Sequence, residues 1–176
     1  KYSGDALRYF LIREIPFGED GDFSEDALKQ RANGELLSDL GNLVSRILTL
    51  VERNKDLKID GEPELDKKLD MKKIQAHMDS LELHHALDEV FNFIRACNGY
   101  INEKEPWKKS GKELSGILYN LLEGLRIIAI LIGPFLPQTS EKINKQLGVK
   151  PGLLKDVSFG KFPGKPRKGP HLFEKV

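Results

Sequence analysis

The stretch LSGILYNLLEGLRIIAILIGP, residues 114–134, decides the fold class of this 176-residue chain. Apolar helix formers dominate it from Leu114 to Ile132, and Gly133 followed by Pro134 ends the run, which predicts one strongly apolar helix. Hydrophobic residues make up 39% of the chain, enough for one sizeable core. No apolar run reaches the roughly 18 residues that a membrane span needs, so we expect no membrane segment.

Helical periodicity recurs on both sides of this stretch. Ser24 is a suitable N-cap before a long amphipathic segment, and Pro106 sets the end of another helix. Apolar residues at three- and four-residue steps, together with these signals, predict further helices over residues 5–13, 24–53, 65–79, 81–104 and 137–148.

The composition changes after Gly148. Proline and glycine recur between residues 151 and 170, which excludes a packed helix and predicts an extended tail over the surface. No alternation typical of strands is visible. We therefore predict an all-α bundle of about five helices with an extended basic C-terminal tail. The chain divides into an N-terminal segment, the bundle and the tail, at residues 1–23, 24–148 and 149–176.

Charge separates the tail from the body. The chain has 28 Lys and Arg against 27 Asp and Glu, a net charge of +1, which does not indicate a general binder of nucleic acid. Residues 149–176 carry seven basic and two acidic residues, or +5, which leaves −4 for residues 1–148. RNA binding must therefore depend on local residues of the body, or on the tail.

The usual patterns of an active site are absent from the sequence. The histidines lack metal-ligand spacing, and no HExxH or CxxC pattern occurs. Glycine-rich phosphate loops and Ser, His and acid arrangements are also missing. Cys97 lies on an apolar face, which favours a core thiol over a nucleophile. We predict no catalytic residue, metal ligand or cofactor for this chain.

Two local patterns offer the chemistry of RNA recognition. Asn42 and Arg46 are four residues apart, hence neighbours on one helix face, and an amide beside a guanidinium can read a base edge. From spacing alone, a hydrogen-bonded surface pair is the commoner explanation.

The second pattern surrounds the only tryptophan. Trp107 follows Pro106 just past a helix end, where an indole fixed by a proline can stack on an unpaired base. A tryptophan in the core is the commoner alternative. Nearby lysines could contribute phosphate contacts: Lys104, Lys108 and Lys109.

Several stretches resemble methionyl-tRNA synthetase, in the same order and over nearly the whole chain. They are DALRYF (5–10), REIPFGEDGDFS (13–24), NLVSR (42–46), EPWK (105–108) and GPFLPQT (133–139). The combination of Asn42 and Arg46 with Pro106 and Trp107 is fairly specific for the methionine enzyme. Two alternatives remain: the anticodon domain of a sister class I synthetase, such as the cysteine or leucine enzyme, and a non-enzymatic helical module that binds proteins and keeps Trp107 in its core.

The resemblance implies a module that binds the anticodon of methionine tRNA, elongator and initiator alike. In that family the tryptophan stacks on anticodon bases, while the asparagine and arginine recognise the first base of CAU. These roles fall on Trp107, Asn42 and Arg46, with Pro106 shaping the platform. Some members have an aspartate at the position of Asn102, which is linked to the rejection of wrong anticodons.

The resemblance also implies a cytoplasmic parent enzyme that ligates methionine to tRNA with ATP and magnesium, without a membrane. Residues 1–23 would be the end of its stem-contact region with a connecting loop, and residues 149–176 would return toward the catalytic domain of the same chain. The HIGH-type and KMSKS-type sequences of that domain are absent. We therefore expect a C-terminal fragment that is inactive alone.

Overall fold

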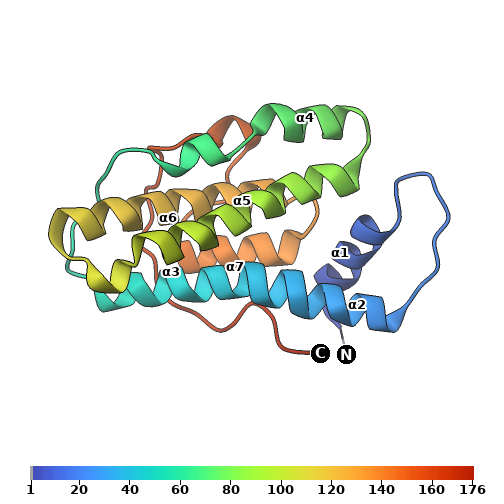
Figure 1. Cartoon of the computed structure of the whole chain (residues 1–176), viewed down its shortest axis with the longest axis horizontal. Helices are drawn as coiled ribbons and strands as arrows, with labels where there is room; N and C mark the ends of the chain where they lie inside the picture. Colours follow the sequence, from blue (N-terminus) through green and yellow to red (C-terminus); the bar gives the residue numbers. More distant parts are fainter. Residues whose placement is uncertain (1) are drawn as a thin grey trace.

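The computed structural model describes residues 2–176, and these residues form α-helices with no strand among them. Lys1, the first residue of the predicted segment 1–23, lies outside the described residues. The helices are α1 (Gly4–Glu14), α2 (Glu25–Arg31), α3 (Asn42–Arg53), α4 (Met71–Asp79), α5 (Leu83–Lys104), α6 (Gly111–Ile132) and α7 (Pro137–Leu147). Helices α3, α5, α6 and α7 run along the long axis, and α1 lies at one end (Figure 1). The predicted all-α bundle is confirmed.

The predicted long helix is confirmed over its whole extent, but its middle is π-helical rather than α-helical. Helices α2 and α3 are joined by the π-helical stretch Ala32–Gly41 into one continuous helix, and the Ser24 hydroxyl caps its start. A Cβ atom at Gly41 would lie 3.3 Å from the Phe173 ring, so the glycine allows the tail to approach the helix closely. The wider π-helical turn was not predictable from the apolar spacing, which is similar in the two helix types.

The predicted helix over residues 65–79 is wrong in its first part. Leu65–Lys68 form a 3-10 turn, Leu69 is extended, and α4 begins only at Met71. The reason is Asp70, whose carboxylate accepts a hydrogen bond from the Lys73 amide at 3.0 Å. A short polar side chain in this position caps a new helix, and its own backbone lies outside the helical conformation.

Helix α6 is the centre of the bundle. Polar residues interrupt its apolar sequence, yet α6 is long and apolar enough to cross a membrane. In this structure 89% of its most apolar stretch is buried inside the protein. Helices α3, α5 and α7 all contact it. The helix that decides the fold class is therefore the core helix, surrounded by its neighbours.

Polar side chains of α6 are buried as well, and the first two take their partners from the loop before α4. The Ser115 hydroxyl accepts a hydrogen bond from the Asp60 amide at 2.8 Å. The Asn120 carbonyl accepts from the amides of Glu64 at 2.7 Å and Leu65 at 3.1 Å. These bonds satisfy buried polar groups and fix an irregular segment against α6.

The other two polar side chains of α6 form a buried ion pair that holds the tail. The Arg126 guanidinium donates to the Glu123 carboxylate at 2.8 Å, with side-chain exposures of 7% and 1%. Arg126 also donates to the carbonyls of Asp156 at 2.9 Å and Ser158 at 2.6 Å, and Glu123 accepts from the Phe162 amide at 2.6 Å. The pair therefore recruits tail backbone to complete its hydrogen bonding.

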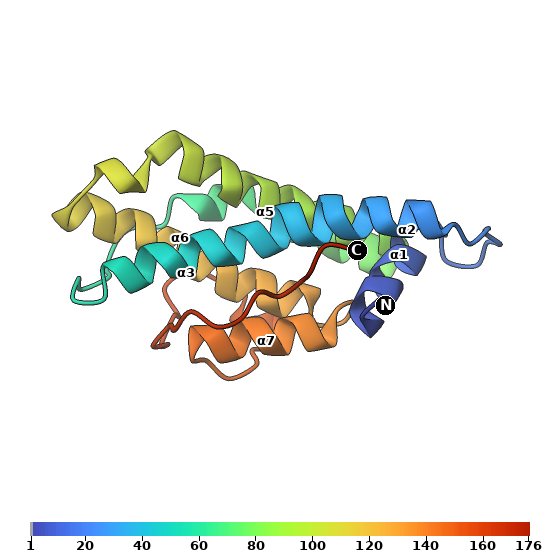
Figure 2. The ribbon, with the colours of Figure 1, turned by 90° about the horizontal axis from the view of Figure 1, so that it is seen from below.

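The tail is extended over the bundle surface, as predicted, apart from the 3-10 turn Leu154–Asp156. It runs along α3 and α7 toward the end of the molecule that carries α1 (Figure 2). The Gln146 side chain on α7 accepts from the Gly169 amide at 3.0 Å and donates to the Pro170 carbonyl at 3.1 Å. Leu172 is only 8% exposed and joins the core. Much of the tail thus packs on this chain's own helices.

Helix α1 is joined to the bundle by buried polar contacts. The Asp5 carboxylate accepts from the Thr139 amide at 2.6 Å and from its hydroxyl at 2.7 Å. The Tyr9 hydroxyl and the Arg31 guanidinium both donate to Glu35. Burial opposes ionisation of Glu35, but these hydrogen bonds and the nearby guanidinium charges outweigh it and lower the pKa of Glu35. The carboxylate is therefore held in its charged form.

Replacing Arg126 by methionine should destabilise the chain by about 3–5 kcal/mol, because it leaves the buried Glu123 carboxylate without its cation. Urea unfolding measures the loss, and limited proteolysis should show earlier cleavage in the tail. A double variant, Glu123→Gln with Arg126→Met, is the control: its neutral amide can still accept from Phe162, so it should recover part of the stability. A loss below about 1 kcal/mol in the single variant would contradict a buried ion pair at this position.

Candidate nucleic-acid interface

Trp107 lies on the tight turn between α5 and α6. Glu105 ends α5 in the left-handed conformation, with φ of 46°, and Pro106–Lys108 form a 3-10 turn. In this turn Pro106 is buried and Trp107 is 55% exposed. The alternative of a core tryptophan is therefore wrong. The indole is presented to solvent on a short, hydrogen-bonded turn, as a stacking surface requires.

Arg46 on α3 reaches the last turn of α5. Its Nη2 atom donates to the Oδ1 atom of Asn102 at 2.7 Å. Asn102 is two residues from the end of α5, just before the turn that carries Trp107. The contact therefore brings the Asn42 and Arg46 pattern to the same end of α5 as the exposed indole.

Two further polar contacts hold α5 against the long helix. Asn98 donates to the Asp39 carbonyl at 3.0 Å, and Arg95 is 3.6 Å from the Asp39 carboxylate. Burial raises the pKa of Asp39 despite the nearby Arg95. Arg95, Asn98 and Asn102 are spaced three and four residues apart, so one face of α5 makes all these contacts. This register fixes where Arg46 lies, and sequence spacing could not reveal it.

Asn42 lies one helical turn before Arg46 and is exposed. Within residues 2–176 its side chain has no hydrogen-bond partner, so its amide group is available to a ligand. It lines a groove of about 390 Å³ between α3 and the tail.

The three lysines near Trp107 are already paired with carboxylates. The pairs are Lys104 with Glu64 at 2.8 Å, Lys108 with Glu105 at 2.8 Å, and Lys109 with Glu113 at 2.6 Å. The hydrogen bond between Lys104 and Glu64 raises the pKa of the lysine and lowers that of the carboxyl. Exposed pairs of this kind are worth about 0–1 kcal/mol, so a phosphate could displace the carboxylates. Phosphate contact by these lysines stays a prediction.

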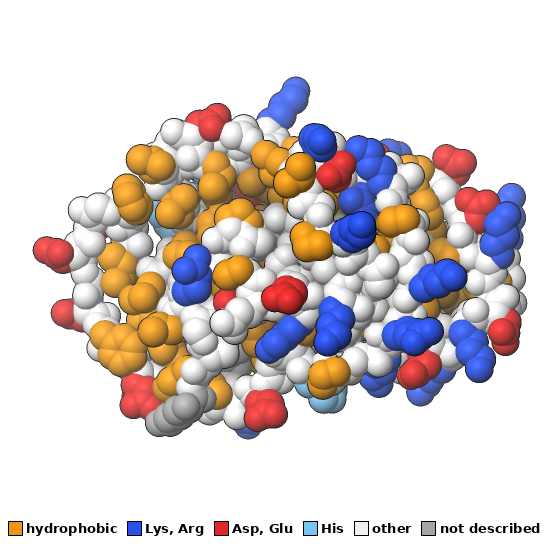
Figure 3. Space-filling view, turned by 180° about the vertical axis from the view of Figure 1, so that it is seen from behind, with side chains coloured by type: hydrophobic (Ala, Val, Ile, Leu, Met, Phe, Trp, Pro, Cys, Tyr) orange, Lys and Arg blue, Asp and Glu red, His pale blue; other side chains and the backbone are white. Residues whose placement is uncertain are grey.

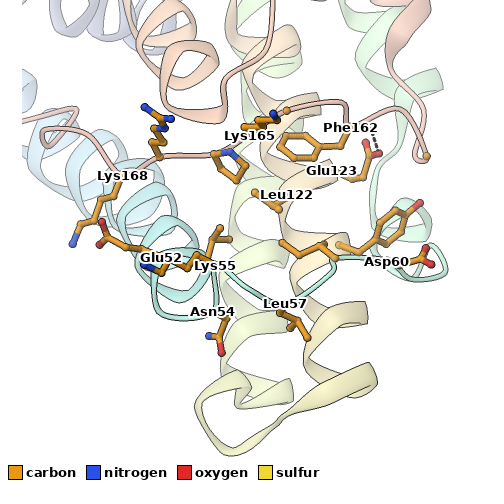
Figure 4. Close-up of a pocket in the computed structure, with 17 residues that line it drawn as sticks. Glu52, Asn54, Lys55, Leu57, Asp60, Leu122, Glu123, Phe162, Lys165 and Lys168 are labelled. Atoms are coloured by element: carbon orange, nitrogen blue, oxygen red, sulfur yellow. Dashed lines mark hydrogen bonds between the residues drawn. The ribbon is translucent and has the colours of Figure 1, made fainter.

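A larger cavity, of about 800 Å³, lies elsewhere, among the end of α3, the loop after it, α6 and the tail (Figure 4). Residues of both charges line it. The basic ones include Lys55, Lys165 and Lys168, and the acidic ones include Glu52 and Asp60. None of the residues predicted to contact RNA lines this cavity. Cavity size therefore does not mark the predicted site.

The described residues 2–176 contain no group of three or more His, Cys, Asp or Glu side chains that could hold a metal ion. Cys97 is buried, and burial raises the pKa of its thiol to about 12. The predicted core thiol is confirmed.

Exposed side chains differ between the two ends of the molecule. On the face opposite that of Figure 1, apolar side chains gather toward the end that carries α1, and Lys and Arg side chains gather over the other half (Figure 3). The exposed large apolar residues of α1 and the loop after it are Leu7, Leu11, Phe17 and Phe23.

Two family models match the chain. The model described as the anticodon-binding domain of tRNA ligase matches residues 68–168, and the model described as tRNA synthetases class I (M) matches residues 1–48. The first of these spans more than half of the chain and includes the turn with Trp107.

Relatives and solved structures agree with these matches. The methionine–tRNA ligase of Caldanaerobacter subterraneus is 40% identical over 100% of this chain and 30% of that protein, and the Bacillus subtilis enzyme is 36% identical over the same shares. The chain thus spans about 30% of the length of these relatives. The apo form of Mycobacterium tuberculosis methionyl-tRNA synthetase aligns with a TM-score of 0.86 and 30% identity, over 98% of this chain and 38% of that one. The chain belongs to the anticodon-binding domains of tRNA ligases, and it is an anticodon-binding region of the methionyl-tRNA synthetase type.

Proposed function

We propose that this chain selects methionine tRNA, elongator and initiator, by its CAU anticodon. The observation that carries the proposal is the hydrogen bond from Arg46 to Asn102, which ties the helix face of Asn42 and Arg46 to the end of α5, just before the turn with the exposed Trp107. The body of the chain carries −4, so it is a poor general binder of phosphate backbones. Stacking and hydrogen bonding to a few unpaired bases suit such a surface better.

Trp107 is the stacking platform. Trp107 is 55% exposed before any ligand binds, and the buried Pro106 precedes it in the turn. Stacking of one base on an aromatic side chain is worth about 1–3 kcal/mol. This contribution is nearly independent of base identity, because every base has a π-face.

Asn42 and Arg46 supply the discrimination. A guanidinium has five N–H donors, so Arg46 can keep its bond to Asn102 and still donate to a base. The free amide of Asn42 offers both a donor and an acceptor one turn away. A well-placed pair of hydrogen bonds to a base edge discriminates against a wrong base by about 1–3 kcal/mol. Asn102 therefore acts as a positioning residue for Arg46.

The ligation of methionine to tRNA belongs, in this proposal, to the part of the parent protein that the chain does not span. We assign ATP and magnesium to that part of the parent protein as well. The exposed apolar surface at α1, with Leu7 and Phe17, is suited to contact the catalytic domain, consistent with segment 1–23 as the end of the stem-contact region. The domain division and a cytoplasmic location stay predictions.

The single tryptophan gives a direct test of RNA binding. Because Trp107 is the only indole and is exposed, its fluorescence should be accessible to acrylamide in the free chain and quenched by an RNA stem–loop with a CAU anticodon. A stem–loop of equal length and charge with an unrelated anticodon is the control and should quench at higher concentrations only. Fluorescence that is indifferent to CAU RNA would contradict the proposal.

Trp107→Ala in the full parent enzyme should lower kcat/KM for aminoacylation of methionine tRNA by about 5- to 150-fold, the loss of one stacked base. Activation of methionine by ATP, measured by pyrophosphate exchange, should be unchanged, because that step needs no anticodon contact. Trp107→Phe keeps an aromatic face and should retain most of the activity. Equal loss of both activities in the alanine variant would indicate a folding defect and refute the assigned role.

Arg46→Gln should weaken discrimination between CAU and anticodons altered at the first base by about 1–3 kcal/mol. Competition binding with paired stem–loops measures this ratio. Arg53→Gln is a matched control, since Arg53 is an exposed arginine at the end of the same helix. If the ratio is the same in the two variants, Arg46 does not read a base.

A further inference from the structure

The groove beside Asn42 has two walls from distant parts of the sequence. Asn42 and Ser45 on α3 lie on one side, and His171 and Phe173 of the tail lie on the other, around about 390 Å³ of open space. This volume falls within the roughly 300–1,000 Å³ of small-ligand sites. The groove is continuous with the candidate RNA interface, because Asn42 belongs to both.

The tail wall is held in place on both sides of the groove. Before it, the Gln146 side chain bonds the backbone of Gly169 and Pro170. Within it, Leu172 is inserted in the core at 8% exposure. After it, the Asn33 side chain bonds both the amide of Val176, at 3.1 Å, and its carbonyl, at 2.9 Å. The groove is therefore preformed, and a ligand entering it does not have to order the tail.

The groups that face the groove suit a planar, polar ring. The Asn42 amide and the Ser45 hydroxyl have no side-chain hydrogen-bond partner within residues 2–176. His171 is an exposed aromatic ring, and Phe173 is a half-buried one that packs against Gly41. Unpaired bases are bound by this combination of aromatic faces and hydrogen-bonding groups. The tail that forms one wall has a net charge of +5, whereas the body has a net charge of −4.

We propose that this groove binds a second unpaired nucleobase of the RNA loop, next to the base that Asn42 and Arg46 read, so that the tail forms part of the RNA interface. The inference rests on the RNA-binding function proposed above. In this arrangement Ser45 contacts the edge of the second base, and His171 contacts its ring. The tail then has a role in recognition besides its packing on the bundle.

The test uses the 176-residue chain and a set of CAU stem–loops, each with one loop base removed to leave an abasic nucleotide. Trp107 quenching reports binding for every combination. For the unchanged chain, one abasic position other than the first anticodon base should weaken binding by about fivefold, the lower end of the range for one stacked base. In a His171→Ala, Ser45→Ala double variant the same abasic position should cost nothing further, because the contact is already lost.

Lys161→Ala is the control for general electrostatics, since it removes a full positive charge from the tail outside the groove. It should weaken all loops equally and leave the abasic pattern unchanged. If the intact loop quenches Trp107 but the double variant leaves the effect of each abasic position unchanged, the proposed base site in the groove is overturned. The function proposed for Trp107 would stand in that case. Absence of quenching by any CAU loop would overturn both.

Discussion

The structure depends on the near-complete burial of α6 beyond its first turn. A helix that is apolar on nearly all sides must be enclosed, and α3, α5 and α7 supply most of the enclosure. The buried polar side chains on α6 set a second requirement, because each needs a hydrogen-bonding partner away from water. Helix α6 supplies only some of these partners, such as the Gly116 carbonyl that accepts from Asn120, since most helical backbone groups are already used. Irregular backbone supplies the other partners, from the loop near Asp60 and from the tail near Phe162.

The position of the tail follows from this requirement. Once the pair Glu123 and Arg126 holds residues 156–162, the rest of the tail must run along α3 and α7, where Gln146 and Asn33 fix its backbone. From the resemblance to the synthetase family alone, we expected residues 149–176 to return toward the catalytic domain. In the structure its Leu172 is part of this chain's core, and its Phe173 packs on Gly41, directly beside the helix face that carries Asn42. The buried ion pair and the candidate RNA interface are thus connected through the extended backbone of the tail.

The candidate interface combines local and long-range effects. The turn at Trp107 is local: a left-handed residue and a proline end α5 and direct the next side chain outward. The place of Arg46 is long-range, because it depends on the register of α5 against the π-helical and α3 parts of the long helix. A shift of one residue in that register would separate Arg46 from Asn102 and from the turn.

The sequence by itself determined the extent of most helices, the extended tail, the core thiol at Cys97 and the adjacency of Asn42 and Arg46 on one face. These features depend on periodicity, caps and prolines within a few residues of one another. Tertiary structure alone decided that Arg46 bonds a residue 56 positions away and that the tail meets the long helix at Gly41. The same side chains could find other hydrogen-bonding and packing partners, so only the packing of distant segments around α6 selects these contacts.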